Sequence, residues 1–224
     1  MKRSDPDSDA PVWDLPVRLF HWSVVLLIGL SWWSAEQSFD RVHFWSGHAL
    51  LFLLVFRILW GFAGSSTARF ATFVRGPAAV VAYLREGGDE RPGHSPIGAL
   101  SVLAMLLALL VQISSGLVQI DEDDFVEGPL AGLVSYDMAV LSHEVHEWSF
   151  NLLLGLVALH LLAVAYYHLV RGRSLIRPMV TGRALLPNGA SPMAPAPKGR
   201  FAACAAAALV LTAIVIAAGE VLAG

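Results

Sequence analysis

The sequence predicts an all-α integral membrane protein with five transmembrane helices. Of its 224 residues, 56% are hydrophobic and only 15% are charged, and the mean hydropathy is +0.61. A soluble domain of this length could not expose so apolar a surface to water. Five nearly unbroken apolar segments approach or exceed the roughly 20 residues that cross the hydrocarbon core of a bilayer. They are residues 17–34, 43–62, 97–120, 140–170 and 201–222.

The first and fourth of these segments need separate comment. The first follows an acidic leader and ends in Trp32 and Trp33 rather than in the small residues of a signal-peptidase site. We therefore expect it to be retained as a helix. The fourth would be about 46 Å long as a continuous helix, whereas the hydrocarbon core is about 30 Å thick. It should tilt or protrude from the membrane.

Basic residues are concentrated in alternate loops, which sets the expected orientation. They precede or open the first helix, and they also lie between the second and third helices and between the fourth and fifth. The other loops are acidic and contain one basic residue, Arg41. By the positive-inside rule, the N-terminus is cytoplasmic and the C-terminus is periplasmic in a bacterial inner membrane.

The segments outside the first four helices offer few chemical groups. Residues 71–84 are expected to form an interfacial helix beneath the cytoplasmic leaflet, and residues 186–199 form a linker rich in Pro, Ala and Gly. The alanine-rich fifth helix is suited to close helix packing. The single cysteine, Cys204, excludes an intrachain disulfide, an iron-sulfur cluster and a zinc ribbon. Redox chemistry would therefore need another cofactor.

Histidines within the apolar segments are the most informative residues, because an ionisable side chain inside a membrane is costly. His146 and His160 are 14 residues apart. At about 100° per residue this spacing returns to within about 40° of the same helix face, with a rise of about 21 Å. His143 does not share that face with His160, since 17 residues place the two about 100° apart. His146 and His160 can therefore line one interior seam.

Two further histidines lie at matching depths on other helices. His21 is near the cytoplasmic start of the first helix, at the level of His160, and His43 opens the second helix, at the level of His146. Two pairs result, each contributed by two helices. Such imidazole pairs clamp a haem iron axially within a helical bundle. Zinc fits less well, because it normally takes four ligands and no carboxylate or thiol adjoins His21 or His160 in sequence.

Three other residues suit the approach of a haem. Gly47 lies one turn after His43 and lacks a side chain where a flat macrocycle could approach the backbone. Arg57 lies 14 residues after His43, and Arg18 lies one turn before His21. Either guanidinium could pair with haem propionates. Helix packing for Gly47 and positive-inside anchoring for Arg18 remain open as alternatives.

These residues carry a family resemblance. The stretch WDLPVRLFHW in the first helix, HFWSGH with Arg57 in the second, and HEW followed by His160 in the fourth resemble the bacterial cytochrome b-561 family. The cytoplasmic stretch ARFATFVRGPAAVVAYL is similar to the branch of the b-type cytochrome subunit of nickel-iron hydrogenases. The resemblance covers roughly residues 11–182. It implies a four-helix transmembrane bundle that holds two haems b, with His21 and His160 near the cytoplasm and His43 and His146 near the periplasm.

Two features depart from the family pattern. The fifth helix is absent from the smallest members, and His48 stands where we would expect an ordinary residue. The expected organisation is therefore a cytoplasmic tail (1–16), a four-helix di-haem domain (17–182), a cytoplasmic linker (183–200) and a fifth transmembrane helix (201–224).

The remaining histidines are given other roles. His48 is an alternative ligand to His43, but its position on the helical wheel differs by about 140°, and the spacing to Gly47 and Arg57 favours His43. His168 is expected at the membrane interface, and His94 in a loop. The sequence HEVH, which contains His143, is one residue short of the zinc-protease motif.

A pair of bis-histidine haems predicts electron transfer, because a saturated iron passes single electrons rather than binding oxygen. We expect a respiratory electron carrier, free-standing or the membrane subunit of an oxidoreductase, between a membrane quinone and a periplasmic redox partner such as a c-type cytochrome. The acidic outer loops could steer a basic partner. An oxidoreductase acting on superoxide is an alternative, although acidic loops would repel that anion. A cofactor-free anchor subunit is another. No nucleic acid partner is expected, and a homo- or hetero-oligomer remains open.

Overall fold

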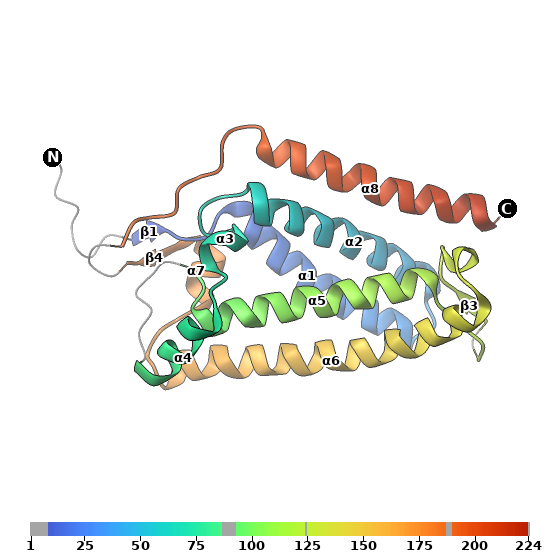
Figure 1. Ribbon diagram of the computed structural model, residues 1–224, viewed down its shortest axis with the longest axis horizontal. Helices are drawn as coiled ribbons and strands as arrows, with labels where there is room; N and C mark the ends of the chain where they lie inside the picture. Colours follow the sequence, from blue (N-terminus) through green and yellow to red (C-terminus); the bar gives the residue numbers. More distant parts are fainter. Residues whose placement is uncertain (1–8, 87–92, 124, 187–189, 224) are drawn as a thin grey trace. The chain divides into compact units, whose positions relative to one another are not determined.

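The computed structural model describes residues 9–86, 93–123, 125–186 and 190–223. Its long helices are α1 (Leu15–Glu36), α2 (Asp40–Ala63), α5 (Pro96–Val118), α6 (Tyr136–Leu169) and α8 (Arg200–Ala223) (Figure 1). All five are long and apolar enough to cross a membrane. The prediction of five transmembrane helices is confirmed, and the chain is a multi-pass membrane protein. The fourth predicted segment becomes the 34-residue α6.

Shorter elements connect these helices. They are β1 (Asp9–Pro11), α3 (Phe70–Phe73), α4 (Pro77–Glu86), β2 (Ile120–Asp121), β3 (Val126–Glu127), the 3-10 helix η1 (Ala131–Leu133), α7 (Ile176–Thr181) and β4 (Arg183–Leu185). The prediction of one interfacial helix over residues 71–84 is wrong, because the structure has α3 and α4 there instead. Proline disfavours helical backbone in the residue before it, so Pro77 starts a new helix rather than continuing α3.

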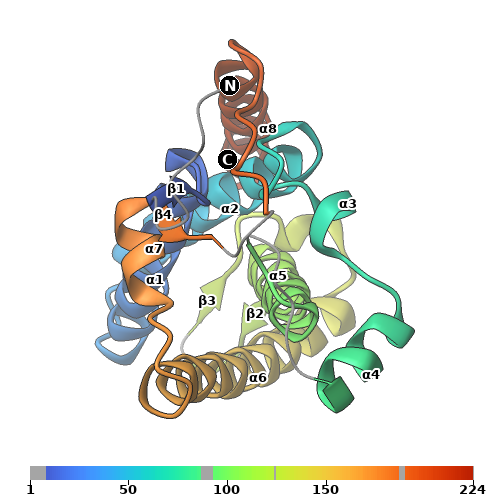
Figure 2. The same cartoon turned by 90° about the vertical axis from the view of Figure 1, so that its left-hand side faces the viewer.

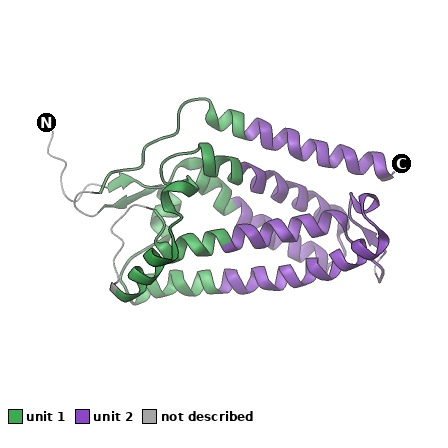
Figure 3. Cartoon of the chain, viewed as in Figure 1, with its two compact units in different colours: residues 1–22, 57–103, 159–204 green, residues 23–56, 104–158, 205–224 purple. Residues whose placement is uncertain are grey.

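The chain divides into two compact units, coloured separately in Figure 3. The first unit comprises residues 1–22, 57–103 and 159–204, and the second comprises residues 23–56, 104–158 and 205–224. Each long helix contributes one segment to each unit. The two units are described separately below.

In the first unit, the N-terminal strand β1 pairs antiparallel with β4, which follows α7, with Asp9 opposite Leu185. Figure 2 shows this two-stranded sheet beside α7. The backbone N–H groups of Val12 and Trp13 both donate to the carbonyl of Gly182. Gly182 ends α7 with φ of 79°, a left-handed conformation that glycine adopts at little cost. The tail and the linker of the sequence analysis are therefore joined by backbone hydrogen bonds.

Asp14 fixes the entry into α1. Its Oδ1 accepts a hydrogen bond from the backbone N–H of Val17 at 2.8 Å, as an N-cap residue does. Its Oδ2 accepts a hydrogen bond from the indole N–H of Trp60 at 2.9 Å. One carboxylate therefore caps α1 and connects it to α2.

In the second unit, close backbone approaches position the segment between α5 and α6. A Cβ at Gly128 would lie 2.5 Å from the carbonyl oxygen of Gly116, and a Cβ at Gly219 would lie 2.8 Å from Cβ of Pro129. Only glycine permits both contacts. Because Gly219 belongs to α8, the fifth helix packs directly against this segment.

Candidate functional site

The second unit brings His43 of α2 and His146 of α6 together. Their ring centroids are 6.2 Å apart and the ring planes are inclined by 73°. The Nδ1 atom of His43 lies 2.9 Å from the carbonyl oxygen of Ser31 in α1. Since a carbonyl oxygen only accepts, Nδ1 carries the proton. The Nε2 atom of His43 is then the basic nitrogen that can bind a metal.

His146 is held in the same way from α5. Its Nδ1 lies 2.8 Å from the backbone carbonyl oxygen of Gln112, so this nitrogen also carries the proton. Histidines that ligate a metal usually donate their other ring N–H to a carbonyl or carboxylate, which fixes the tautomer and orients the ring. Both histidines of this pair therefore have the hydrogen bonding of axial ligands.

The side chain of Gln112 also contacts His146, a relation that the sequence analysis missed. The amide nitrogen of Gln112 lies 2.9 Å from Nε2 of His146, and the hydroxyl of Ser149 donates to the amide oxygen. The amide thus contacts Nε2, the ring nitrogen available to a metal, and it would have to turn aside for that nitrogen to bind iron. An isolated glutamine in an apolar helix is the signal that could have identified it.

Two glycines border this pair. A Cβ at Gly116 would lie 2.6 Å from Cε1 of His146 and 2.8 Å from its Nδ1, so the ring packs directly on the backbone of α5. Gly116 was not among the predicted site residues. At Gly47, which was predicted, a Cβ would meet no atom within 4 Å. The backbone of α2 is therefore accessible to a flat ligand beside His43.

The first unit brings together His21 of α1 and His160 of α6. Their ring centroids are 6.5 Å apart and the ring planes are inclined by 53°. The Nδ1 atom of His21 is buried and has no hydrogen-bond partner among the described residues. A buried nitrogen without a partner costs free energy unless a ligand or water satisfies it.

Both pairs have the spacing that a haem iron needs. An imidazole nitrogen lies about 2 Å from the metal that it ligates and the ring centre about 1 Å further, so two axial rings have centres about 6 Å apart. The observed 6.2 and 6.5 Å agree with this spacing. Across the described ranges, no group of three or more His, Cys, Asp or Glu could hold a metal ion. The residues present fit a haem better than a bare ion.

The two predicted arginines have protein partners in the first unit. The Arg57 side chain is only 2% exposed, donates to the carbonyl of Ala68 at 3.3 Å, and lies 5.0 Å over the ring of Phe70. Arg18 donates to the carbonyls of Val180 at 2.6 Å and Thr181 at 3.4 Å, at the C-terminal end of α7. Its Nε is buried and has no partner within the described ranges. Contacts of either residue with haem propionates stay predictions.

His94 is enclosed by aromatic rings just before α5. Its ring centroid is 4.6 Å from that of Trp13 and 4.6 Å from that of Phe73. Burial lowers the pKa of His94 to about 3, and the positive charge of Arg57 and the nearby His160 lower it further in the same direction. The imidazole is therefore neutral at physiological pH.

The other histidines stand apart from the two pairs. Nε2 of His143 is 4.0 Å from a carboxylate oxygen of Glu147, one turn further along α6, and His168 is exposed. The ring of His48 lies 6.5 Å from that of Trp45, and its Nε2 is buried with no partner in the described part of the chain.

We predict that Gly116→Ala disrupts the His43–His146 pair, because the added Cβ would overlap the ring of His146. Haem content per chain, measured from a reduced-minus-oxidised spectrum, should fall by about half if each pair holds one haem. Gly29→Ala is the matched control, since a Cβ there meets nothing within 4 Å. Equal haem content in the two variants would contradict the prediction.

We also predict that acidification destabilises the protein through His94. In the unfolded chain, His94 binds a proton once the pH falls below its ordinary pKa of about 6.5. In the folded chain, it binds that proton only when the pH falls to its lowered pKa of about 3. The free energy of unfolding should therefore fall as the pH decreases between these values. His94→Gln should show a smaller loss of thermal stability between pH 7.5 and pH 5. An equal loss in both proteins would exclude this role.

Comparison with known proteins agrees with these features. A family model described as prokaryotic cytochrome b561 matches residues 12–182. The match takes in α1 to α7 and ends before α8. No curated protein and no solved structure gives a match. Because the matched range covers well over half of the chain, this protein belongs to the prokaryotic cytochrome b561 family.

Proposed function

We propose that this membrane b-type cytochrome, which takes part in electron transfer as its family does, holds two haems b. His21 and His160 would ligate one, and His43 and His146 the other. The observation that carries the proposal is that each unit contains one pair of histidines with ring centres about 6 Å apart. In each pair, α6 contributes one histidine, and the other comes from α1 or α2.

A bound haem would supply one-electron redox chemistry at each pair. The protein residues orient the ligands: the carbonyls of Ser31 and Gln112 hold the Nδ1 protons of His43 and His146. If both imidazoles of a pair ligated the iron, no iron position would remain for oxygen or substrate. Electron transfer, rather than atom transfer, is therefore the chemistry that this arrangement favours.

Gly47 and the arginines would complete the haem surroundings. The open backbone at Gly47 lets a macrocycle approach α2 beside His43. Arg57 brings a nearly fully buried guanidinium into the first unit, and Arg18 retains a buried Nε without a partner among the described residues. Charge-assisted hydrogen bonds from either guanidinium would stabilise the propionates of the His21–His160 haem.

The two haems would carry electrons across the inner membrane between a periplasmic redox partner and the quinone pool. Support comes from α6, which contributes His146 to one pair and His160 to the other. Support for a basic periplasmic partner comes from the loop after α5, where Glu122, Asp123 and Glu127 are exposed. Opposite charge on a partner would raise the association rate. Asp124 of the same loop lies outside the described residues.

Electron transfer across a membrane can be measured directly. Proteoliposomes that contain the haem-loaded protein and enclose ferricyanide should reduce the ferricyanide when a hydroquinone is added to the bilayer. His146→Ala and His160→Ala should each lower the rate at least tenfold, because each breaks one of the two relays, whereas His143→Ala should not. A rate that survives both substitutions would contradict the proposed route.

The acidic loop predicts a salt-dependent reaction with a basic protein. Replacing Asp121, Asp123 and Asp124 with Asn should flatten the salt dependence of electron exchange with a basic c-type cytochrome, since screening acts only on the charges that remain. Replacing Asp5 and Asp7 with Asn gives a control that also removes negative charge, on the side of the membrane predicted to be opposite to this loop. An unchanged salt dependence in the loop variant would remove this partner.

A further inference from the structure

A cavity of about 450 Å³ in the second unit is lined by the first turns of α2, by residues 127–132 and by the last turns of α8. The start of α2 follows one predicted membrane crossing, residues 127–132 follow three, and the end of α8 follows five. Because all three numbers are odd, the three parts belong to the same membrane surface. The cavity therefore lies at the depth of lipid headgroups rather than in the middle of the hydrocarbon core.

The wall that α8 contributes is specific to the fifth helix. It consists of Ile216, Gly219, Glu220 and Leu222, all outside the residues 12–182 that match the family model. A Cβ at Gly219 would lie 2.8 Å from Cβ of Pro129, so this wall packs closely on the segment after β3. The cavity is therefore a feature that α8 adds to the matched core.

The lining contains charged groups of both signs. Arg41 comes from α2, Glu127 from β3 and Glu220 from α8. All three residues are exposed. A guanidinium pairs well with a phosphate, and a carboxylate with an ammonium group. One positive and two negative charges around a single cavity suit a zwitterion better than an anion.

His48 adds a buried hydrogen-bond acceptor to the same lining. One of its ring nitrogens donates to the backbone carbonyl of Phe44, one turn earlier in α2. Nε2 is the other nitrogen, and it is buried without a hydrogen-bond partner in the described ranges. Since a neutral imidazole has one donor and one acceptor, Nε2 accepts. A ligand that donates an N–H group would remove the cost of leaving this nitrogen unpaired.

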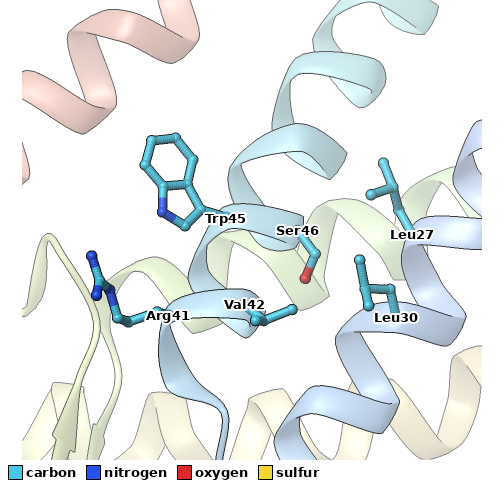
Figure 4. A pocket seen from close by; sticks show the side chains of 6 residues that line it. All are labelled: Leu27, Leu30, Arg41, Val42, Trp45 and Ser46. Carbon is cyan, nitrogen blue, oxygen red and sulfur yellow. The ribbon is translucent and has the colours of Figure 1, made fainter.

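A second cavity, of about 530 Å³, shares Arg41 and Trp45 with the first. Figure 4 shows its lining, in which these two residues lie near the aliphatic side chains of Leu27, Leu30 and Val42. The aliphatic side chains belong to helices that can span a membrane, and tryptophan is enriched at the level of the headgroups. A polar cavity and an apolar one are thus adjacent, as the head and the chain of a lipid require.

We propose that the cavity at α8 binds the headgroup of phosphatidylethanolamine, and that one acyl chain lies along the second cavity. Arg41 binds the phosphate, Glu127 and Glu220 bind the ammonium group, and Nε2 of His48 accepts one of its N–H groups. The site goes beyond the proposed function, because it needs neither haem nor electron transfer.

Other common phospholipids fit the lining less well. The trimethylammonium group of phosphatidylcholine has no N–H to donate to the carboxylates or to His48. Phosphatidylglycerol has a net negative charge and no cation, so Glu127 and Glu220 would repel it. The proposal therefore predicts a preference among lipids that differ only in their headgroups.

The test is native mass spectrometry of the full chain in detergent. Phosphatidylethanolamine, phosphatidylcholine and phosphatidylglycerol with identical acyl chains are added in equal amounts. Phosphatidylethanolamine should be retained about tenfold more than either of the others, a factor equivalent to about 1.4 kcal/mol. This comparison needs no variant, so it does not depend on how a substitution affects folding.

Two substitutions assign the two ends of the headgroup. Glu220→Gln should lower the retention of phosphatidylethanolamine threefold to tenfold, because it removes one carboxylate from the ammonium group. Glu36→Gln is the matched control, since Glu36 is an exposed glutamate at the same membrane surface outside both cavities. Arg41→Gln should lower the retention of phosphatidylethanolamine and phosphatidylcholine by the same factor, because both carry a phosphate.

Several results would overturn the assignment. They are equal retention of phosphatidylethanolamine and phosphatidylcholine, preferential retention of phosphatidylglycerol, retention of no lipid, or equal retention by Glu220→Gln and Glu36→Gln. None of these measurements depends on haem content or on electron transfer. A failure of this site would therefore leave the proposed function unchanged, and a failure of the proposed function would leave this site unchanged.

Discussion

An imidazole inside a membrane helix needs a partner for both of its ring nitrogens, because an unpaired polar group in hydrocarbon costs several kcal/mol. For Nδ1 of His43 and of His146, the partner comes from a neighbouring helix. Backbone carbonyls of Ser31 and Gln112 accept the Nδ1 protons of His43 and His146. These hydrogen bonds fix the tautomer, so each Nε2 remains basic. The proposed ligation of haem by this pair depends on these two hydrogen bonds.

Close packing completes the arrangement around His146. The ring lies against Gly116, and its Nε2 is contacted by the amide of Gln112, which Ser149 holds by its oxygen. The same amide would have to move for iron to bind at Nε2 of His146. In the first unit, Nδ1 of His21 has no such partner among the described residues.

Much of this organisation could be predicted from the sequence, for identifiable reasons. The five helices followed from apolar length alone, and the grouping of histidines followed from the 14-residue spacing on α6 and from matching depths. Contacts between residues distant in sequence could not be predicted in this way. They include the pairing of β1 with β4, the hydrogen bonds from Arg18 to the end of α7, and the packing of the His146 ring against Gly116. The prediction of a single interfacial helix was wrong because Pro77 begins a new helix.

The most direct test of the central claim is the number of haems per polypeptide, measured on the purified protein with a reduced-minus-oxidised spectrum and repeated for His146→Ala and His160→Ala. The account predicts about two haems b in the unmodified chain, since each histidine pair ligates one, and the loss of one haem in each variant. A folded, fully expressed protein without haem, or variants that retain both haems, would contradict it.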